Sequence, residues 1–176
     1  MTDGFEAAKA QRNALERLGA SIPGYRGFQD RELRRDVDRL QREHLATELT
    51  RFKGALRDRA RPYTEGGHLG SLGGFDRLDR ELDGLSQAIR FSDYGATGLF
   101  DAVKVREPEL AQLYAFDLSV LDDLKEIEAA IGALPAPGGD DPAAGLEALR
   151  GRVRALADKW KGRAQVIGNV VQTGRA

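Results

Sequence analysis

Hydrophobic residues recur along most of the chain at alternating intervals of three and four, the spacing of a buried helix face. The regular run at 75–89 is Phe75, Leu78, Leu82, Leu85 and Ile89. A longer run is Leu110, Leu113, Asp117, Val120, Leu124, Ile127, Ile131 and Leu134. The last is Leu146, Leu149, Val153, Leu156, Trp160, Arg163, Ile167 and Val170. These runs predict three amphipathic helices, two of which have a charged residue in the apolar seam.

The N-terminal part predicts two further helices, over about 3–19 and 29–61. The first turns Phe5, Ala8, Leu15 and Leu18 inward. The second runs about 33 residues to "RPY", and its apolar positions slip between Leu40 and Leu45. Pro23, Gly24 and Gly27 break the chain between these helices, and "EGGHLGSLGG" at 65–74 is expected to be a flexible connector.

Five helices and no strand pattern predict an all-α fold, an antiparallel helical bundle or coiled-coil hairpins of four to five helices with a long second helix. We expect a bundle over 1–134 and a linker with a helix start over 135–145, where Asp141 is the N-cap. A basic amphipathic helix over 146–176 then packs on the bundle or on a partner. The long second helix leaves apolar positions for another subunit, which predicts a homo-oligomer.

Composition narrows the class further. The 176 residues suit one domain, and the lack of cysteine excludes disulfides, thiol nucleophiles and thiolate metal sites. The N-terminus is charged throughout, and no apolar run approaches the roughly 18 residues of a membrane span. These features predict a cytoplasmic protein.

Charge is unevenly distributed although the net charge is −1. Residues 66–141 hold 6 basic and 15 acidic residues, whereas residues 142–176 hold 7 and 2. Either these surfaces neutralise one another in the fold or an oligomer, or the basic helix binds nucleic acid. The residues of this second hypothesis are Arg150, Arg152, Arg154, Lys159, Lys161 and Arg163. Pairs such as Asp38–Arg42, at i,i+4 spacing, partly neutralise the arginines of the second helix. Binding of the C-terminal helix to a membrane surface is a weaker variant.

Motifs for catalysis or cofactors do not emerge. The glycine-rich 65–74 stretch fits no phosphate-binding loop, and Gln41 stands where a di-iron site would need a glutamate before His44. His44 is interpreted as a structural polar residue, with Glu48 as candidate partner, and His68 as solvated. We therefore expect no metal, no cofactor, no small-molecule substrate and no enzyme activity.

Asp117 interrupts the apolar seam of its helix and must find a cation or hydrogen-bond donors if it stays ionised. Candidate donors are an arginine of the second helix, Arg163 or a tyrosine hydroxyl. The favoured interpretation is a polar contact that fixes the helix register. The competing hypothesis is a site formed by Asp117, His44 and the 91–105 stretch.

The stretch "FSDYGATGLFDAVKV" at 91–105 is too aromatic for a casual linker. The pattern predicts a folded turn between two helices or, alternatively, an exposed surface that binds a partner. The residues of that partner-binding hypothesis are Tyr94, Leu99, Phe100, Asp101 and Lys104.

The segments "SIPGYRGFQDRELRRDVDRL" and "YGATGLFDAVKVREPELAQLYAFDLSVLDDL" resemble a group of uncharacterised bacterial helical proteins, over roughly residues 20–134. That resemblance implies a bacterial helical protein and assigns no activity. The sequence as a whole predicts a non-enzymatic scaffold or protein-interaction protein that self-associates, with DNA binding as the alternative.

Overall fold

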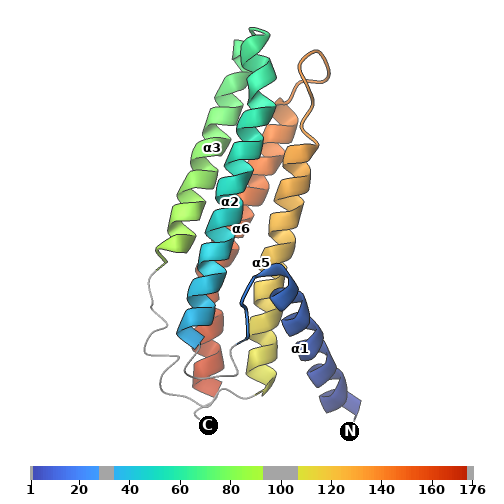
Figure 1. The fold of residues 1–176 in the computed structure, drawn as a ribbon, viewed down its shortest axis with the longest axis vertical. Coiled ribbons are helices and arrows are strands. Elements are labelled where there is room, and N and C mark those ends of the chain that lie inside the picture. The colour runs from blue at the N-terminus through green and yellow to red at the C-terminus, as the bar shows by residue number, and fades with distance from the viewer. Residues whose placement is uncertain (1, 28–33, 93–106, 174–176) are drawn as a thin grey trace. The chain divides into compact units, whose positions relative to one another are not determined.

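All regular structure in the described part of the chain is helical. The computed structural model describes residues 2–27, 34–92 and 107–173 (Figure 1). The helices are α1 (Thr2–Ser21), α2 (Arg34–Glu65), α3 (Leu69–Arg90), α5 (Glu107–Gly132) and α6 (Ala143–Thr173). The prediction of an all-α bundle with a long second helix is confirmed. Among the described residues, no helix combines the length and apolar character needed to cross a bilayer.

Contacts divide the chain into two units, and the division cuts across three helices. Unit 1 takes residues 1–44, 92–121 and 159–176, and unit 2 takes residues 45–91 and 122–158. Each of α2, α5 and α6 therefore contributes residues to both units. The expected boundaries at 134 and 146 followed chain order, whereas each contact unit combines segments that are far apart in the chain.

Unit 2 consists of two antiparallel helical hairpins. In the first, Arg57 of α2 pairs with Asp79 of α3, and the Tyr63 ring lies 5.3 Å from the Phe75 ring. In the second, Arg152 of α6 pairs with Glu126 of α5. The C-terminal end of α5 approaches the N-terminal end of α6, as expected for antiparallel neighbours.

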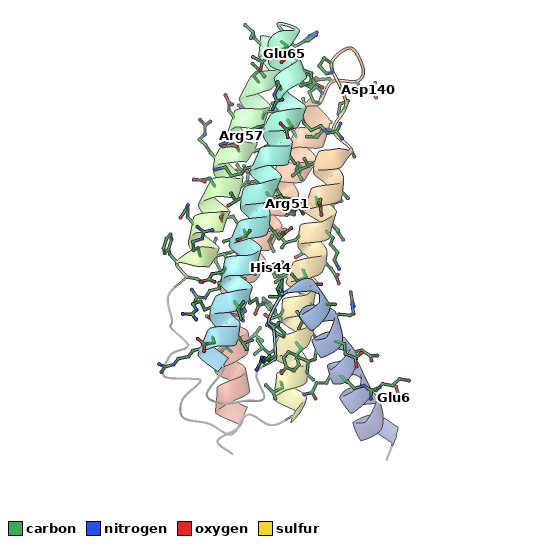
Figure 2. The ribbon with its side chains drawn as sticks, in the orientation of Figure 1. Glu6, His44, Arg51, Arg57, Glu65 and Asp140 are labelled. Carbon is green, nitrogen blue, oxygen red and sulfur yellow. The ribbon has the colours of Figure 1, made fainter. Side chains whose placement is uncertain are left out.

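The two hairpins lie side by side, with α2 beside α5 and α3 beside α6. Arg51 of α2 donates to Glu128 of α5 at 2.6 Å, and the Tyr63 hydroxyl donates to the Pro135 carbonyl at 2.9 Å. Arg150 of α6 donates to Glu81 of α3 at 2.7 Å. Arg51 and Arg57 follow one another along α2 in Figure 2, each reaching a different neighbouring helix.

The apolar seams predicted for α3 and α5 are buried at every position, and so are the seam positions of α6 from Leu146 to Ile167. In α2, Leu45, Leu49, Phe52 and Leu56 are each at most 1% exposed. These α2 side chains pack within the chain, so they do not supply the open apolar face that we expected a second subunit to cover.

The turn between α2 and α3 is shorter than the sequence suggested. The helix α2 continues through Pro62 to Glu65, and α3 begins at Leu69, so most of the expected connector is helical. Tyr63 is 3% exposed and packs in the core, which favours the extra turn despite the proline. Gly67 has φ +73° and reverses the chain. The expectation of a flexible 65–74 connector was wrong because packing outweighed glycine propensity.

The slip expected in the seam of α2 is also absent. Asp38 and Gln41 are 7% and 0% exposed, whereas Leu40 is half-buried. With Leu45 next, the inward positions follow helical spacing without a break. The inward-facing positions of α2 include polar residues, and the prediction missed them because it followed apolar residues alone.

Candidate functional site

Arg163 is the centre of a buried group of charged and amide side chains in unit 1. It donates from Nε to Asp117 of α5 at 3.0 Å and from Nη1 to Asp38 of α2 at 2.5 Å. It also donates from Nη2 to Gln41 Oε1 at 2.9 Å. Its guanidinium carbon lies 5.0 Å from the Trp160 ring centroid, a cation–π contact. One side chain of α6 thereby links α2 and α5.

Asp38 has a second cation, because Arg42 donates to its other oxygen at 2.9 Å. We call Asp38, Gln41, Arg42, Asp117 and Arg163 the buried ionic cluster. Its two arginines balance its two aspartates, and none of the five residues is more than 7% exposed. Buried ions require such pairing because the loss of hydration otherwise costs several kcal/mol per ion.

Ionisation in the cluster is shifted by burial and by charge. Burial raises the pKa of Asp117 above its ordinary 3.8, although the charge of Arg163 opposes the rise. For Arg163, burial by itself lowers the pKa, but Asp117 and Asp38 outweigh it and the pKa is raised. Arg163 therefore stays cationic at every accessible pH. Burial disfavours the ionised form of Asp117, and its pairing with Arg163 only partly offsets this effect.

Tyr25, in the connector that follows α1, is packed beside this cluster. Its side chain is 7% exposed. Burial raises the pKa of its hydroxyl, and the charge of Asp117 raises that pKa further. The Tyr25 hydroxyl is therefore buried within the electrostatic influence of the cluster.

This arrangement has the chemistry of a packing contact. Asp117 Oδ1 and Oδ2 lie 3.0 and 3.5 Å from nitrogens of Arg163, and Asp117 is fully buried. A general acid must reach the reacting group of a substrate. The described part of the chain contains no group of three or more His, Cys, Asp or Glu side chains that could hold a metal ion.

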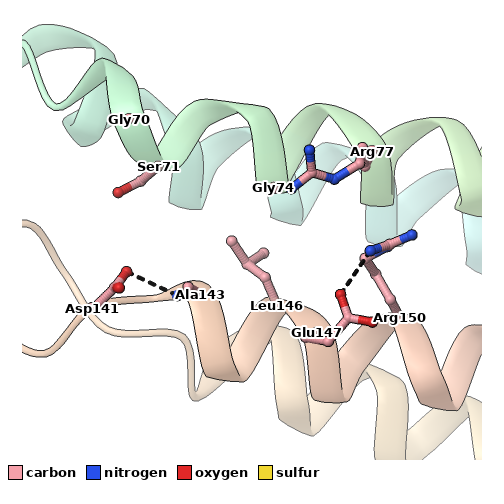
Figure 3. Close-up of a pocket in the computed structure, with 9 residues that line it drawn as sticks. All are labelled: Gly70, Ser71, Gly74, Arg77, Asp141, Ala143, Leu146, Glu147 and Arg150. Carbon is pink, nitrogen blue, oxygen red and sulfur yellow. Dashed lines mark hydrogen bonds and ion pairs between the residues drawn. The ribbon is translucent and has the colours of Figure 1, made fainter.

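A surface groove of about 560 Å³ lies in unit 2 between the N-terminal turns of α3 and α6. Gly70, Ser71, Gly74 and Arg77 of α3 form one wall, and residues 141–150 form the other (Figure 3). The groove is lined by two arginines, Arg77 and Arg150, and by two acidic residues, Asp141 and Glu147, so its formal charges balance. Glu147 is bonded to Arg150 at 2.7 Å. The groove offers no excess charge to select an ion.

A second groove, of about 420 Å³, lies in unit 2 between the end of α2 and the Pro135–Ala136–Pro137 segment. Its charged residues are engaged locally. Asp58 accepts from Arg61 at 2.5 Å, and Arg59 donates to the Gly132 carbonyl at 2.5 Å. Its other lining residues are alanines and prolines, which carry no acid–base groups.

Four of the six cations assigned to nucleic-acid binding are engaged within the chain. Arg150 and Arg154 both pair with Glu81, Arg152 pairs with Glu126, and Arg163 lies in the buried ionic cluster. The pairing of Glu81 lowers its pKa, chiefly through Arg150. Lys159 and Lys161 belong to unit 1 and also have interactions. This pattern matches the interpretation in which basic and acidic surfaces neutralise one another.

The remaining predicted residues divide in two groups. Tyr94, Leu99, Phe100, Asp101 and Lys104 lie outside the described residues. His44 is half-buried at the end of unit 1, and Glu48, its suggested partner, accepts from Arg51 at 2.7 Å.

Sequence reasoning identified Asp117 and Arg163 as seam residues, and Arg163 was one of three candidate donors. It treated Asp38 and Arg42 as an i,i+4 pair that partly neutralises the arginines of the second helix, and it did not identify Gln41 as an inward residue. A signal existed: Asp38 and Gln41 continue the seam spacing of Leu45. Three helices with polar residues at seam positions indicate that these residues meet.

Comparison with known proteins adds no assignment, since the chain matches no protein-family model, no curated protein and no solved structure.

Proposed function

We propose that this chain is a non-enzymatic helical scaffold that acts through contacts with other proteins, including a second copy of itself. The observation that carries the proposal is the use of the inward-facing charges. Arg163, Asp117 and Asp38 bind one another across three helices, with their hydrogen-bonding groups directed at each other. Buried charges that pair with one another across helices favour one arrangement of those helices.

The proposed contact surface is the 91–105 stretch. Phe91, its first residue, is the C-cap that follows α3, and 72% of its surface is exposed. Exposed aromatic side chains are common anchors of protein interfaces. Phe100 belongs to the same stretch and to the partner-binding set predicted from the sequence.

Sedimentation velocity over a range of concentrations tests self-association. We expect the wild type to associate and Phe91→Ser to weaken association by about tenfold or more, as for an interface anchor. Leu69→Ser is the matched control, because Leu69 is 69% exposed at the other end of α3. A strict monomer at all concentrations, with no protein recovered on the immobilised chain from native extract, contradicts the proposal.

Nucleic-acid binding is the weaker proposal, because four of its six cations already pair with carboxylates of the chain. Retention on DNA that falls steeply as salt rises would support it over the scaffold hypothesis. Binding to anionic vesicles would instead support the membrane-surface variant. A cytoplasmic location completes the proposal, and cell fractionation tests it.

A further inference from the structure

The helix α1 and the connector that follows it pack against the rest of unit 1 through a small set of close contacts. Leu18 and Ile22 are both 0% exposed, and Tyr25 follows them into the interior. Gly27 has φ +78°, and a Cβ at this position would lie 2.7 Å from both Leu15 Cδ1 and the Tyr114 hydroxyl. The chain from α1 to Gly27 is thus held against α5 by a closely fitted glycine.

The interior beneath this segment differs from that of unit 2. Among the described residues, every buried polar or charged side chain except Ser86 belongs to unit 1. The connector packs on the helix turns that carry the cluster, because Gly27 lies against Tyr114, three residues before Asp117 on α5, and Gly24 lies near Leu40 of α2. The charges of Asp117, Arg163 and Asp38 also act on the Tyr25 hydroxyl. Unit 2, in contrast, is filled by the apolar seams of its four helix segments.

This difference changes the free energy of local opening. Exposing an apolar core to water is opposed by its whole buried area. Exposing a cluster of ions returns hydration to groups that lost it on folding, which offsets part of that cost. Segments with low opening free energies are those that move separately from the rest of a protein.

We propose that α1 and the connector through Gly27 form a strap that opens and closes over the buried ionic cluster while unit 2 stays folded. Opening admits water to Asp117 and Arg163. The strap then controls the access of water to the cluster. This inference does not depend on self-association.

Because the chain has no cysteine, a single introduced thiol reports opening at its own position. Leu18→Cys places the thiol on the buried face of the strap itself, and Leu82→Cys places it in α3 at the same 0% exposure. Labelling by a disulfide reagent in the full chain is followed with increasing urea. We expect Leu18→Cys to react at least about tenfold faster, with weak urea dependence, as in sub-global opening. Equal rates with the same steep urea dependence for both variants would overturn the proposal.

A second pair of variants, built into both thiol backgrounds, tests the fit of the strap. Gly24 and Gly27 share positive φ, but a Cβ at Gly24 would meet Leu40 Cδ1 only at 3.7 Å. Alanine in the left-handed region shifts the equilibrium by about tenfold toward the open state at either position, and the clash at Gly27 adds to this shift. We expect Gly27→Ala to accelerate labelling of Leu18→Cys more than Gly24→Ala does, with Leu82→Cys unchanged. Equal acceleration at both thiols by Gly27→Ala would show global opening and refute the strap.

Discussion

At the scale of single residues, the charge balance of the buried ionic cluster determines the cost of substitution. Asp117→Leu leaves two arginines against one aspartate, and Arg163→Leu leaves two aspartates against one arginine. Either change leaves a buried charge without its partner, which lowers the free energy of unfolding by about 3 to 5 kcal/mol. The double variant keeps the neutral Asp38–Arg42 pair and avoids this penalty.

We therefore predict strong coupling between Asp117 and Arg163. Urea unfolding of the double variant should show a loss smaller than the sum of the single losses by about 2 kcal/mol or more. The exposed pair Asp36–Arg39 on α2, at 3.1 Å, is the control, and its cycle should give less than about 1 kcal/mol. Additive losses at Asp117 and Arg163 would show that the cluster does not act as a unit.

The identity of this pair was partly accessible from the sequence. A carboxylate in an apolar seam must have a partner, so Asp117 and its candidate Arg163 emerged from helix spacing alone. Asp38, Gln41 and Arg42 did not, because i,i+4 charges in a helix usually lie in water. The spacing of Asp38 and Gln41 from Leu45 was compatible with an inward face, but which helices pack against that turn of α2 is not encoded locally.

At the scale of elements, two glycines inside helices show that helix propensity and side-chain packing can act in opposite directions. A Cβ on Gly54 of α2 meets nothing within 4 Å, whereas one on Gly74 of α3 would lie 2.8 Å from Leu146 Cδ1. Gly74 permits the close approach of α3 to α6 beside the larger groove (Figure 3). The same substitution therefore has opposite consequences at the two positions.

Gly54→Ala should stabilise the chain by about 0.5 to 1 kcal/mol, since alanine restricts the unfolded backbone and favours helix. Gly74→Ala should destabilise by about 1 to 3 kcal/mol, the usual cost of overpacking. Thermal and denaturant unfolding measure both variants. Stabilisation by Gly74→Ala would mean that Leu146 repacks without strain.

At the scale of the whole molecule, Glu81 and Asp117 change the stability of the chain in opposite directions as the pH falls. The pKa of Glu81 lies below its ordinary 4.5, mainly because of its bond to Arg150. A lowered pKa gives stability that is present above 4.5 and lost as the pH falls through the folded-state value. Asp117 has a raised pKa, so its contribution has the opposite sign and rises as the pH falls.

We predict that the wild type is more stable than Glu81→Gln at pH 7 and that the difference shrinks as the pH falls below 4.5. Chemical denaturation at a series of pH values gives the two curves. Arg61→Gln serves as a control, because Arg61 pairs only with exposed Asp58 among the contacts described. A difference between wild type and Glu81→Gln that does not vary with pH would contradict the assignment.

The sequence by itself determined the all-α class and most of the buried helix faces among the described residues, because helical periodicity and chain breakers are local properties. It also determined that Asp117 needs a partner. The tertiary structure alone decided the grouping into units across three helices and the inward turn of Asp38, Gln41 and Arg42. It also decided the engagement of the basic residues of α6 by carboxylates of other helices. These features depend on contacts between residues far apart in the chain, where geometry and desolvation outweigh local preference.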